Sequence, residues 1–184
     1  DIEIYSKNLQ SALNAGHWEA VELLAQELLS CWREGRQVFI CGNGGSASNA
    51  IHASNDLLHG ISPADDVGIR AHALPSNTAV TTCLGNDIGY EYIFCSQLET
   101  LANPSDVLLA MSGSGNSQNI INAIVKAQQI GMKSFAILGF DGGKAKSLSD
   151  VAIHFPIDDM QISEDLQMVV MHAIMTVSYT HLTL

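Results

Sequence analysis

Apolar residues recur along this chain with two different spacings. Up to about Gly35 they return at roughly helical spacing, which predicts two helices that end at this glycine. After Gly35, short apolar runs alternate with longer segments of helical spacing, and these runs predict strands. The expected strands are Gln37–Cys41, Ala71–Pro75, Asp106–Met111, Lys133–Leu138 and Val151–Phe155. The expected later helices are Ser46–Leu58, Asn77–Gly85, Tyr90–Ala102, Ser117–Ile130 and Ser163–Tyr179.

The alternation of strands with helices indicates the fold class. Connections of this kind place strands side by side in parallel, with helices on both faces of the sheet. We therefore predict an α/β fold: a three-layer αβα sandwich with a five-stranded parallel, flavodoxin-like sheet and N-terminal helices. The 184 residues fit a single domain over 1–184, with a helical segment at 1–35 and an α/β core at 36–184.

The charged residues limit the possible ligands. Lys and Arg number 8 and Asp and Glu number 19, which gives a net charge of −11. We expect no binding to nucleic acid or to an anionic membrane, because both require a basic patch. Basic residues are missing between Arg36 and Arg70, and again between Arg70 and Lys126. An anion site in those stretches must therefore use backbone N–H groups and hydroxyls.

The expected location is the cytoplasm. We find no signal peptide, and no apolar run reaches the ~18 residues that a membrane span needs. The cysteines form no CxxC pair and no zinc-finger spacing, so we interpret them as reduced, buried thiols. They are Cys31, Cys41, Cys83 and Cys95.

Two loops rich in glycine, serine and asparagine follow the predicted strands Gln37–Cys41 and Asp106–Met111. Glycine allows a tight turn and a close approach of the backbone to a ligand. Each loop also opens a helix, whose first N–H groups are unpaired and attract an anion. The loops therefore predict a phosphate site without lysine or arginine; the alternative is a pair of ordinary strand–helix turns capped by serine. The candidate residues are Asn43, Gly44, Gly45 and Ser46 in the first loop, and Ser112, Gly113, Ser114, Asn116 and Ser117 in the second.

The first loop does not fit other phosphate-binding motifs. The spacing Gly42-x-Gly44-x-x-Ala47 is similar to a dinucleotide fingerprint. However, the next predicted strand leads into Ser76 and Asn77 and not into the acidic residue that binds a ribose. The chain has no GKS or GKT sequence, which excludes a nucleotide-triphosphate P-loop, and no GxSxG elbow.

Imidazole and carboxylate side chains on two predicted helices form a second candidate centre. His52 and Asp56 are four residues apart, which places them on one helix face, one turn apart. Such a pair can bind a metal or act as acid and base, and it also occurs by chance on surface helices. The last helix carries Glu164, Gln167 and His172. Glu164 and His172 are about 12 Å apart along the axis, so spacing alone does not show a metal site.

Together, the loops and helices resemble the SIS (sugar isomerase) domain family, and within it the phosphoheptose isomerases. The resemblance runs from about residue 5 to residue 178, with the motifs in register. They are Cys41-Gly-Asn-Gly-Gly-Ser46, His52, Leu84-Gly-Asn-Asp-Ile-Gly89, Met111-Ser-Gly-Ser-Gly-Asn-Ser117, Asp141-Gly-Gly143 and the helix from Glu164 to His172. The resemblance implies an isomerase that interconverts sedoheptulose 7-phosphate and D-glycero-D-manno-heptose 7-phosphate. It also implies a homotetramer with active sites between subunits.

The resemblance assigns roles to individual residues. Those expected to bind the sugar phosphate are Ser46, Ser112, Ser114 and Ser117, and those expected to line the sugar are Asn43, Asp87 and Glu164. Those expected to hold a divalent metal, often zinc in the family, are His52, Asp56, Glu164 and His172. The expected catalytic base is Asp56 and the expected acid is His172. A carboxylate that binds a metal is a weaker base, so the metal and base roles of Asp56 compete.

Three departures from the family pattern leave an alternative open. Asp56 stands where the family has Glu, Glu164 stands where it has Gln, and the basic residues expected after the first loop's helix are replaced by Leu58-His59-Gly60. Such changes would suit a non-catalytic sugar-phosphate-binding SIS protein that acts as a regulator or scaffold. Against this alternative, both histidines are retained and both altered positions keep a carboxylate. The isomerase interpretation is therefore preferred.

Overall fold

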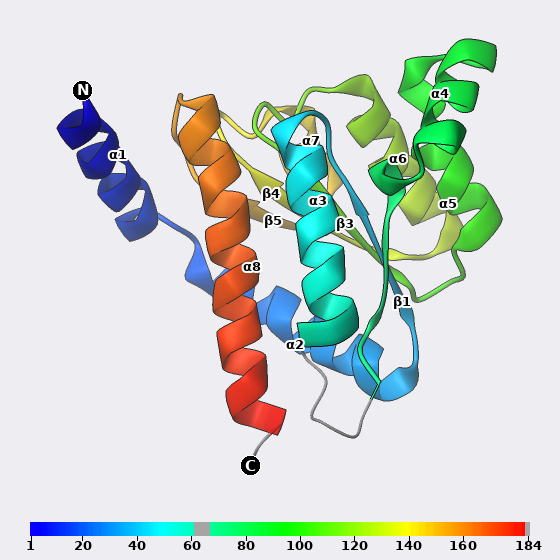
Figure 1. Cartoon of the computed structure of the whole chain (residues 1–184), viewed down its shortest axis with the longest axis horizontal. Helices are drawn as coiled ribbons and strands as arrows, with labels where there is room; N and C mark the ends of the chain where they lie inside the picture. Colours follow the sequence, from blue (N-terminus) through cyan, green and yellow to red (C-terminus); the bar gives the residue numbers. More distant parts are fainter. Residues whose placement is uncertain (61–66, 183–184) are drawn as a thin grey trace.

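A five-stranded, all-parallel sheet lies between two layers of helices in the computed structural model, which describes residues 1–60 and 67–182 (Figure 1). The strands run in the order β2-β1-β3-β4-β5. Their bounds are Gln37–Cys41 for β1, Arg70–Ala73 for β2, Val107–Ser112 for β3, Lys133–Leu138 for β4 and Val151–His154 for β5. This is the flavodoxin-like order, so the predicted fold class is confirmed.

Helices cover both faces of the sheet. Their bounds are Ile2–Asn14 for α1, Trp18–Glu34 for α2, Gly45–Asn55 for α3, Thr78–Asp87 for α4, Cys95–Leu101 for α5, Gln118–Ile130 for α6, Gly143–Leu148 for α7 and Met160–Leu182 for α8. The elements α2, α3 and α8 pack on one face, and α5, α6 and α7 on the other. Figure 1 shows α3 and α8 side by side, and α1 standing at the outer side of α8.

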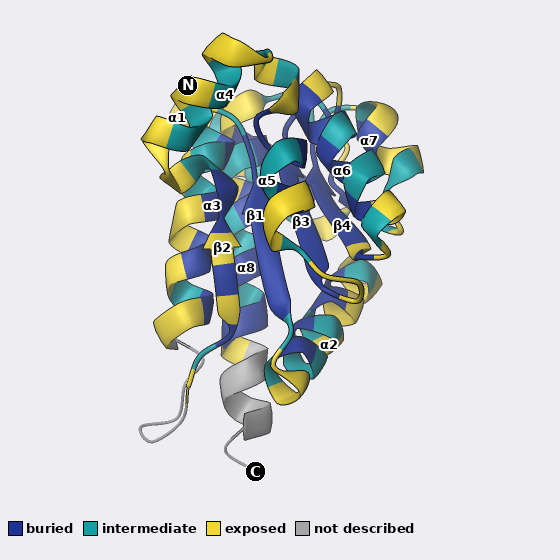
Figure 2. Ribbon diagram, turned by 90° about the vertical axis from the view of Figure 1, so that its right-hand side faces the viewer, coloured by how far each residue is buried: buried dark blue, intermediate teal, exposed yellow. Residues whose placement is uncertain are grey.

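Alternating side chains of the central strands fill two separate cores. Val38 and Ile40 of β1 face α2, α3 and α8, whereas Phe39 and Cys41 face α5 and α6. All five residues of β1 are buried, as expected for a strand with helices on both sides. Figure 2 shows this buried sheet at the centre, with the exposed residues on the outer sides of the helices.

Some predicted elements differ from the structure. The expected helix Tyr90–Ala102 is split into a 3₁₀ turn at Tyr90–Tyr92 and α5. The expected helix Ser46–Leu58 is α-helical only to Asn55 and continues as a single π turn, Asp56–Gly60. The six-residue α7 was not predicted, because so short a segment has too few residues to show a helical period.

The prediction of buried thiols is wrong for one cysteine. Cys31, Cys41 and Cys95 are buried and free, but Cys83 is exposed on α4. That helix contributes no buried residue, although Ala79, Val80 and Leu84 give its sequence an apolar character. In the part of the chain that the structure describes, no helix combines the length and the apolar character that crossing a membrane requires.

Candidate active site

The two glycine–serine loops meet at the centre of the sheet. β1 and β3 are neighbouring strands, but the helices that follow them, α3 and α6, lie on opposite faces. The connections therefore diverge beyond the carboxyl ends of these strands. In open α/β sheets this switch point is the usual ligand site. The fold thus brings the two predicted anion loops together.

A side chain of α8 hydrogen-bonds to the first loop. Gly44 has a φ of +58°, a conformation that favours glycine, and it directs the chain into α3. The hydroxyl of Ser46 is buried and accepts a 2.9 Å hydrogen bond from Nε2 of Gln167. Because Gln167 donates, the hydroxyl of Ser46 keeps its own hydrogen for a second partner.

The second loop is folded on itself and on α7. The hydroxyl of Ser112 accepts from the N–H of Gly115 at 3.0 Å, and that of Ser114 accepts from the N–H of Asn116 at 3.3 Å. Oδ1 of Asn116 accepts from the N–H of Lys144 at 3.1 Å. Gly115 has a φ of +64°, and a Cβ there would lie 2.0 Å from the carbonyl oxygen of Gly142. Only glycine therefore fits this close approach of two loops.

A side-chain network joins the first loop to α6 and to the 3₁₀ turn. The amides of Asn43 and Asn119 bond each other in both directions, at 2.9 Å and 2.8 Å. The hydroxyl of Tyr90 also donates to Oδ1 of Asn43 at 2.9 Å. The sequence predicts a role for Asn43 but not for Asn119 or Tyr90, because neither of these two stands in a recognisable loop or spacing.

Three predicted residues come together where α3 ends beside α8. Nε2 of His52 lies 3.4 Å from Oδ2 of Asp56, and Nε2 of His172 lies 3.7 Å from the same oxygen. One ligand atom from each residue lies within 4.8 Å of the others. The side chains of His52 and His172 are 52% and 56% exposed in the single chain, and that of Asp56 is 20% exposed. We call His52, Asp56 and His172 the triad.

The triad's donor atoms suit a divalent metal. Two imidazole nitrogens and one carboxylate oxygen are a common protein set for zinc, with a further position open for water or substrate. Glu164 is outside this group: its carboxylate lies against Gly45, where a Cβ would come within 2.1 Å of Oε2. The single chain thus brings three of the four predicted metal ligands together and places the fourth at the first loop.

Asp87 ends helix α4 and faces its own helix. It accepts from Nδ2 of Asn86 at 2.8 Å and from the thiol of Cys83 at 3.3 Å. These two hydrogen bonds lower the pKa of Asp87 below its ordinary value. Tyr90 follows three residues later and reaches Asn43, so this segment borders the first loop.

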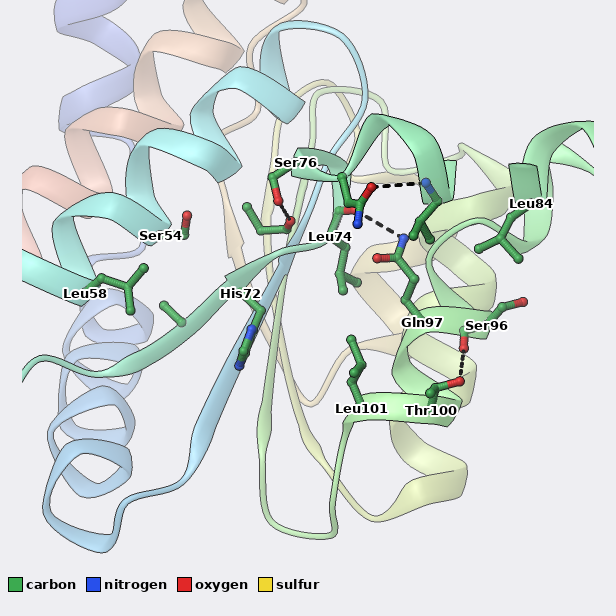
Figure 3. Close-up of a pocket in the computed structure, with 14 residues that line it drawn as sticks. Ser54, Leu58, His72, Leu74, Ser76, Leu84, Ser96, Gln97, Thr100 and Leu101 are labelled. Atoms are coloured by element: carbon green, nitrogen blue, oxygen red, sulfur yellow. Dashed lines mark hydrogen bonds between the residues drawn. The ribbon is translucent and has the colours of Figure 1, made fainter. Parts of the chain in front are cut away.

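A cavity of about 620 Å³ lies along the outer edge of β2. Figure 3 shows it between Ser54 and Leu58 on one side and Gln97, Thr100 and Leu101 on the other, with His72 from β2. None of the predicted site residues lines it. A second cavity, of about 630 Å³, is lined by Ser114 and Asn116 of the second loop together with Asp141, His154 and Asp158.

Comparison with known proteins identifies the family of this chain. Residues 4–139 match the family model described as SIS domain. The chain belongs to the SIS domain family. A phosphoheptose isomerase of Helicobacter pylori is 39% identical over 170 residues, which cover 92% of this chain and 85% of that protein.

Two solved SIS structures superpose closely on the whole fold. The phosphoheptose isomerase of Francisella tularensis has a TM-score of 0.90 at 28% identity and covers 97% of this chain and 94% of its own. That of Neisseria gonorrhoeae has a TM-score of 0.88 at 28% identity and covers 97% and 95%. Within the SIS domain family, the chain is therefore of the phosphoheptose isomerase type, as its motifs predict.

Proposed function

We propose that this SIS domain, as a single unit over residues 1–184, is an aldose–ketose isomerase of phosphosugars. Its expected reaction interconverts sedoheptulose 7-phosphate and D-glycero-D-manno-heptose 7-phosphate through an enediol. The observation that carries the proposal is the position of the triad at the far end of α3, the helix that starts at the first anion loop, where α3 meets α8. Ser46 and His52 are six residues apart on α3, about 9 Å along its axis. Phosphate at one end of an extended sugar would thus leave its carbonyl end near the triad.

The two loops hold the phosphate in this proposal. The hydroxyls of Ser46, Ser112, Ser114 and Ser117 supplement the N–H groups at the starts of α3 and α6. Neither loop contains a lysine or arginine, so oriented neutral donors supply the binding. Asn43, Asp87 and Glu164 are the residues that would contact the sugar. Holding the remote phosphate in this way keeps the carbonyl carbon and the neighbouring carbon beside the acid and the base.

Asp56 and His172 carry out the proton transfers. Asp56 removes the proton from the carbon next to the carbonyl, while His172 gives a proton to the carbonyl oxygen, and a cis-enediol results. Asp56 then returns its proton to the neighbouring carbon, and His172 recovers a proton from the other hydroxyl. The double bond to oxygen has thereby moved by one carbon, with no net change in protons. His52, 3.4 Å from Asp56, orients the carboxylate.

The triad would also hold a divalent metal, and zinc is the expected ion. When bound there, such an ion polarises the carbonyl oxygen and stabilises the negative charge that develops on it. Glu164 adds a negative charge at the position where the family has Gln, which would strengthen the attraction for a cation. Because the metal and base roles of Asp56 compete, activity with and without metal separates them.

We further propose that the enzyme is a cytoplasmic homotetramer with its sites between subunits. The exposure of both triad histidines in the single chain supports this arrangement, since acid–base sites normally exclude water. A tetramer would cover them with a neighbouring chain.

The second candidate function is a sugar-phosphate-binding regulator or scaffold without catalysis. The substitution of Asp56 and Glu164 for the family residues is the observation in its favour. The isomerase fits better, because a scaffold has no need for a carboxylate held between two histidines.

A coupled assay with sedoheptulose 7-phosphate tests the isomerase. The protein is first stripped of metal and then assayed with and without added zinc. Turnover in either arm supports the isomerase, and restoration by zinc assigns the metal to the site. Absence of turnover in both arms, with sugar phosphate still bound, would refute the isomerase and favour the binding protein.

A further inference from the structure

Asn119 forms a buried bridge between the two anion loops. It is the second residue of α6, only 2% exposed, and follows the second loop directly. Its Nδ2 donates to Oδ1 of Asn43 at 2.8 Å, and its Oδ1 accepts from Nδ2 of Asn43 at 2.9 Å. This reciprocal pair crosses from the segment after β3 to the segment after β1. It is a direct side-chain link between the loops at the switch point.

The hydrogen-bonding capacity of Asn43 is nearly used up by the protein. Its Oδ1 accepts from Asn119 and from the hydroxyl of Tyr90, which occupies both acceptor positions of an amide oxygen. Its Nδ2 donates one of its two hydrogens to Oδ1 of Asn119. Oδ1 of Asn119 is likewise used twice, by Asn43 and by the N–H of Ile120. Among the described residues, one side-chain N–H of Asn43 therefore keeps no protein partner and is available to a ligand.

We propose that Asn119 is a positioning residue for phosphate, and that Tyr90 supports it through Asn43. The inference rests on the proposed function, in which both loops bind one phosphate. Without a lysine or arginine in either loop, affinity depends on neutral N–H and O–H donors aimed from α3 and α6. Such bonds weaken steeply with misalignment, so the distance between the loops must be fixed. A buried amide pair fixes it, because opening the pair leaves buried polar atoms without partners.

The test compares Asn119→Leu with a matched variant on the same helix. Asn122, one turn further along α6, donates to the carbonyl of Glu91 at 2.9 Å and accepts from Nε2 of Gln118 at 2.8 Å, and neither of these partners belongs to the two loops. Asn122→Leu therefore removes an amide of the same kind without releasing the loops. Inorganic phosphate binding is measured by calorimetry, kcat and KM with sedoheptulose 7-phosphate, and unfolding by urea. Tyr90→Phe, which removes one hydroxyl, is a milder second variant that keeps the amide pair.

Asn119→Leu is expected to weaken phosphate binding about tenfold and to raise KM by the same factor, with kcat changed about twofold or less. Tyr90→Phe is expected to weaken phosphate binding about threefold, and Asn122→Leu to leave it unchanged while lowering stability. Unchanged phosphate affinity in Asn119→Leu, or an equal loss in Asn122→Leu, overturns the proposal. If Asn119→Leu does not fold, unchanged phosphate affinity in Tyr90→Phe overturns it instead.

The failure of the proposed function is distinguishable from the failure of this inference. If the wild-type protein binds phosphate but does not isomerise the sugar, the proposed function is contradicted. The phosphate affinities of the variants still decide the role of Asn119 in that case. A wild-type protein that binds no phosphate contradicts both.

Discussion

Gln167 on α8 donates a hydrogen bond from Nε2 to the hydroxyl oxygen of Ser46, at 2.9 Å, and both side chains are buried. Oε1 of Gln167 accepts from Nδ2 of Asn49, one turn along α3, at 2.9 Å. The second bond fixes which end of the amide faces Ser46. The last helix of the chain thus determines the direction in which the first loop presents its hydroxyl.

Replacing this glutamine tests that relationship. Gln167→Leu leaves the buried hydroxyl of Ser46 and the amide of Asn49 each short of one partner, so it is expected to lower the free energy of unfolding by about 1–3 kcal/mol. Phosphate binding should weaken as well, because Ser46 is then free to rotate. Gln97→Leu is the control, since Gln97 donates to the carbonyls of Leu74 and Ile93 and lies outside both loops. Equal phosphate affinity in the two variants would contradict the link to Ser46.

Asp56→Asn and His172→Gln separate chemistry from binding. Each keeps the size of the side chain and removes its ability to exchange a proton. The value of kcat is expected to fall by at least about 100-fold, the usual contribution of a general acid or base. The affinity for inorganic phosphate should stay near that of the wild type, because both residues lie away from the loops. Full turnover in either variant would remove that residue from the proposed mechanism.

The sequence predicts the sheet and both loops well, because their signals are local. Short apolar runs mark the strands, and Gly44 or Gly115 marks a backbone conformation that few other residues adopt. The sequence does not predict which helix residues hydrogen-bond to these loops, because those residues are distant along the chain. Asn119 looks like an ordinary helix residue, and Gln167 stands among the candidate residues of the last helix without a role of its own. The fold brings them to Asn43 and Ser46, 76 and 121 residues away.

The placement of Glu164 shows the same limit. Its family position predicts a metal ligand, but eight residues of helix separate it from His172. Because of this separation, the carboxylate of Glu164 lies against Gly45 at the start of α3, whereas the triad lies at the end of α3. The sequence gives the spacing of residues along one helix. It does not give the packing of α8 against α3, which decides which residues lie opposite each turn.

Zinc is expected to raise the melting temperature of the metal-stripped protein, because a ligand that binds only the folded state stabilises it. His52→Ala and His172→Ala each remove one of three clustered donors and should abolish most of this rise. His59→Ala is the matched control, since His59 is exposed in the adjacent π turn and lies outside the triad. The melting temperature is followed by differential scanning fluorimetry at several zinc concentrations. A rise that persists in His172→Ala and vanishes in His59→Ala would place the metal elsewhere.

Gly45→Ala tests the place of Glu164. The three atoms nearest to a Cβ at Gly45 all belong to the carboxylate of Glu164, which is the far end of a flexible side chain. The fold should therefore tolerate the change, within about 1 kcal/mol in the free energy of unfolding, because alanine is also favoured in a helix. Catalytic efficiency should fall, since Glu164 is pushed aside. In a Glu164→Ala background the same change should cost no further activity. An equal loss in both backgrounds would show that Gly45 acts independently of Glu164.

Glu27 on α2 makes stability depend on pH, at the end of the sheet away from the site. Its carboxylate lies 2.8 Å from Nζ of Lys133 and 2.8 Å from the guanidinium of Arg36. Burial alone would raise the pKa of Glu27, but the hydrogen bonds from these two cations outweigh it and lower the pKa below its ordinary value.

The stabilisation of the folded state by ionised Glu27 is therefore fully present above the unfolded pKa of about 4.3 and is lost as the pH falls through the folded value. Urea unfolding should show Glu27→Gln about 1 kcal/mol less stable than the wild type at pH 7, with the difference shrinking below about pH 4. Glu22→Gln, an exposed change on the same helix, should match the wild type throughout, and a Glu27→Gln difference that stays constant down to pH 3 would contradict the assignment.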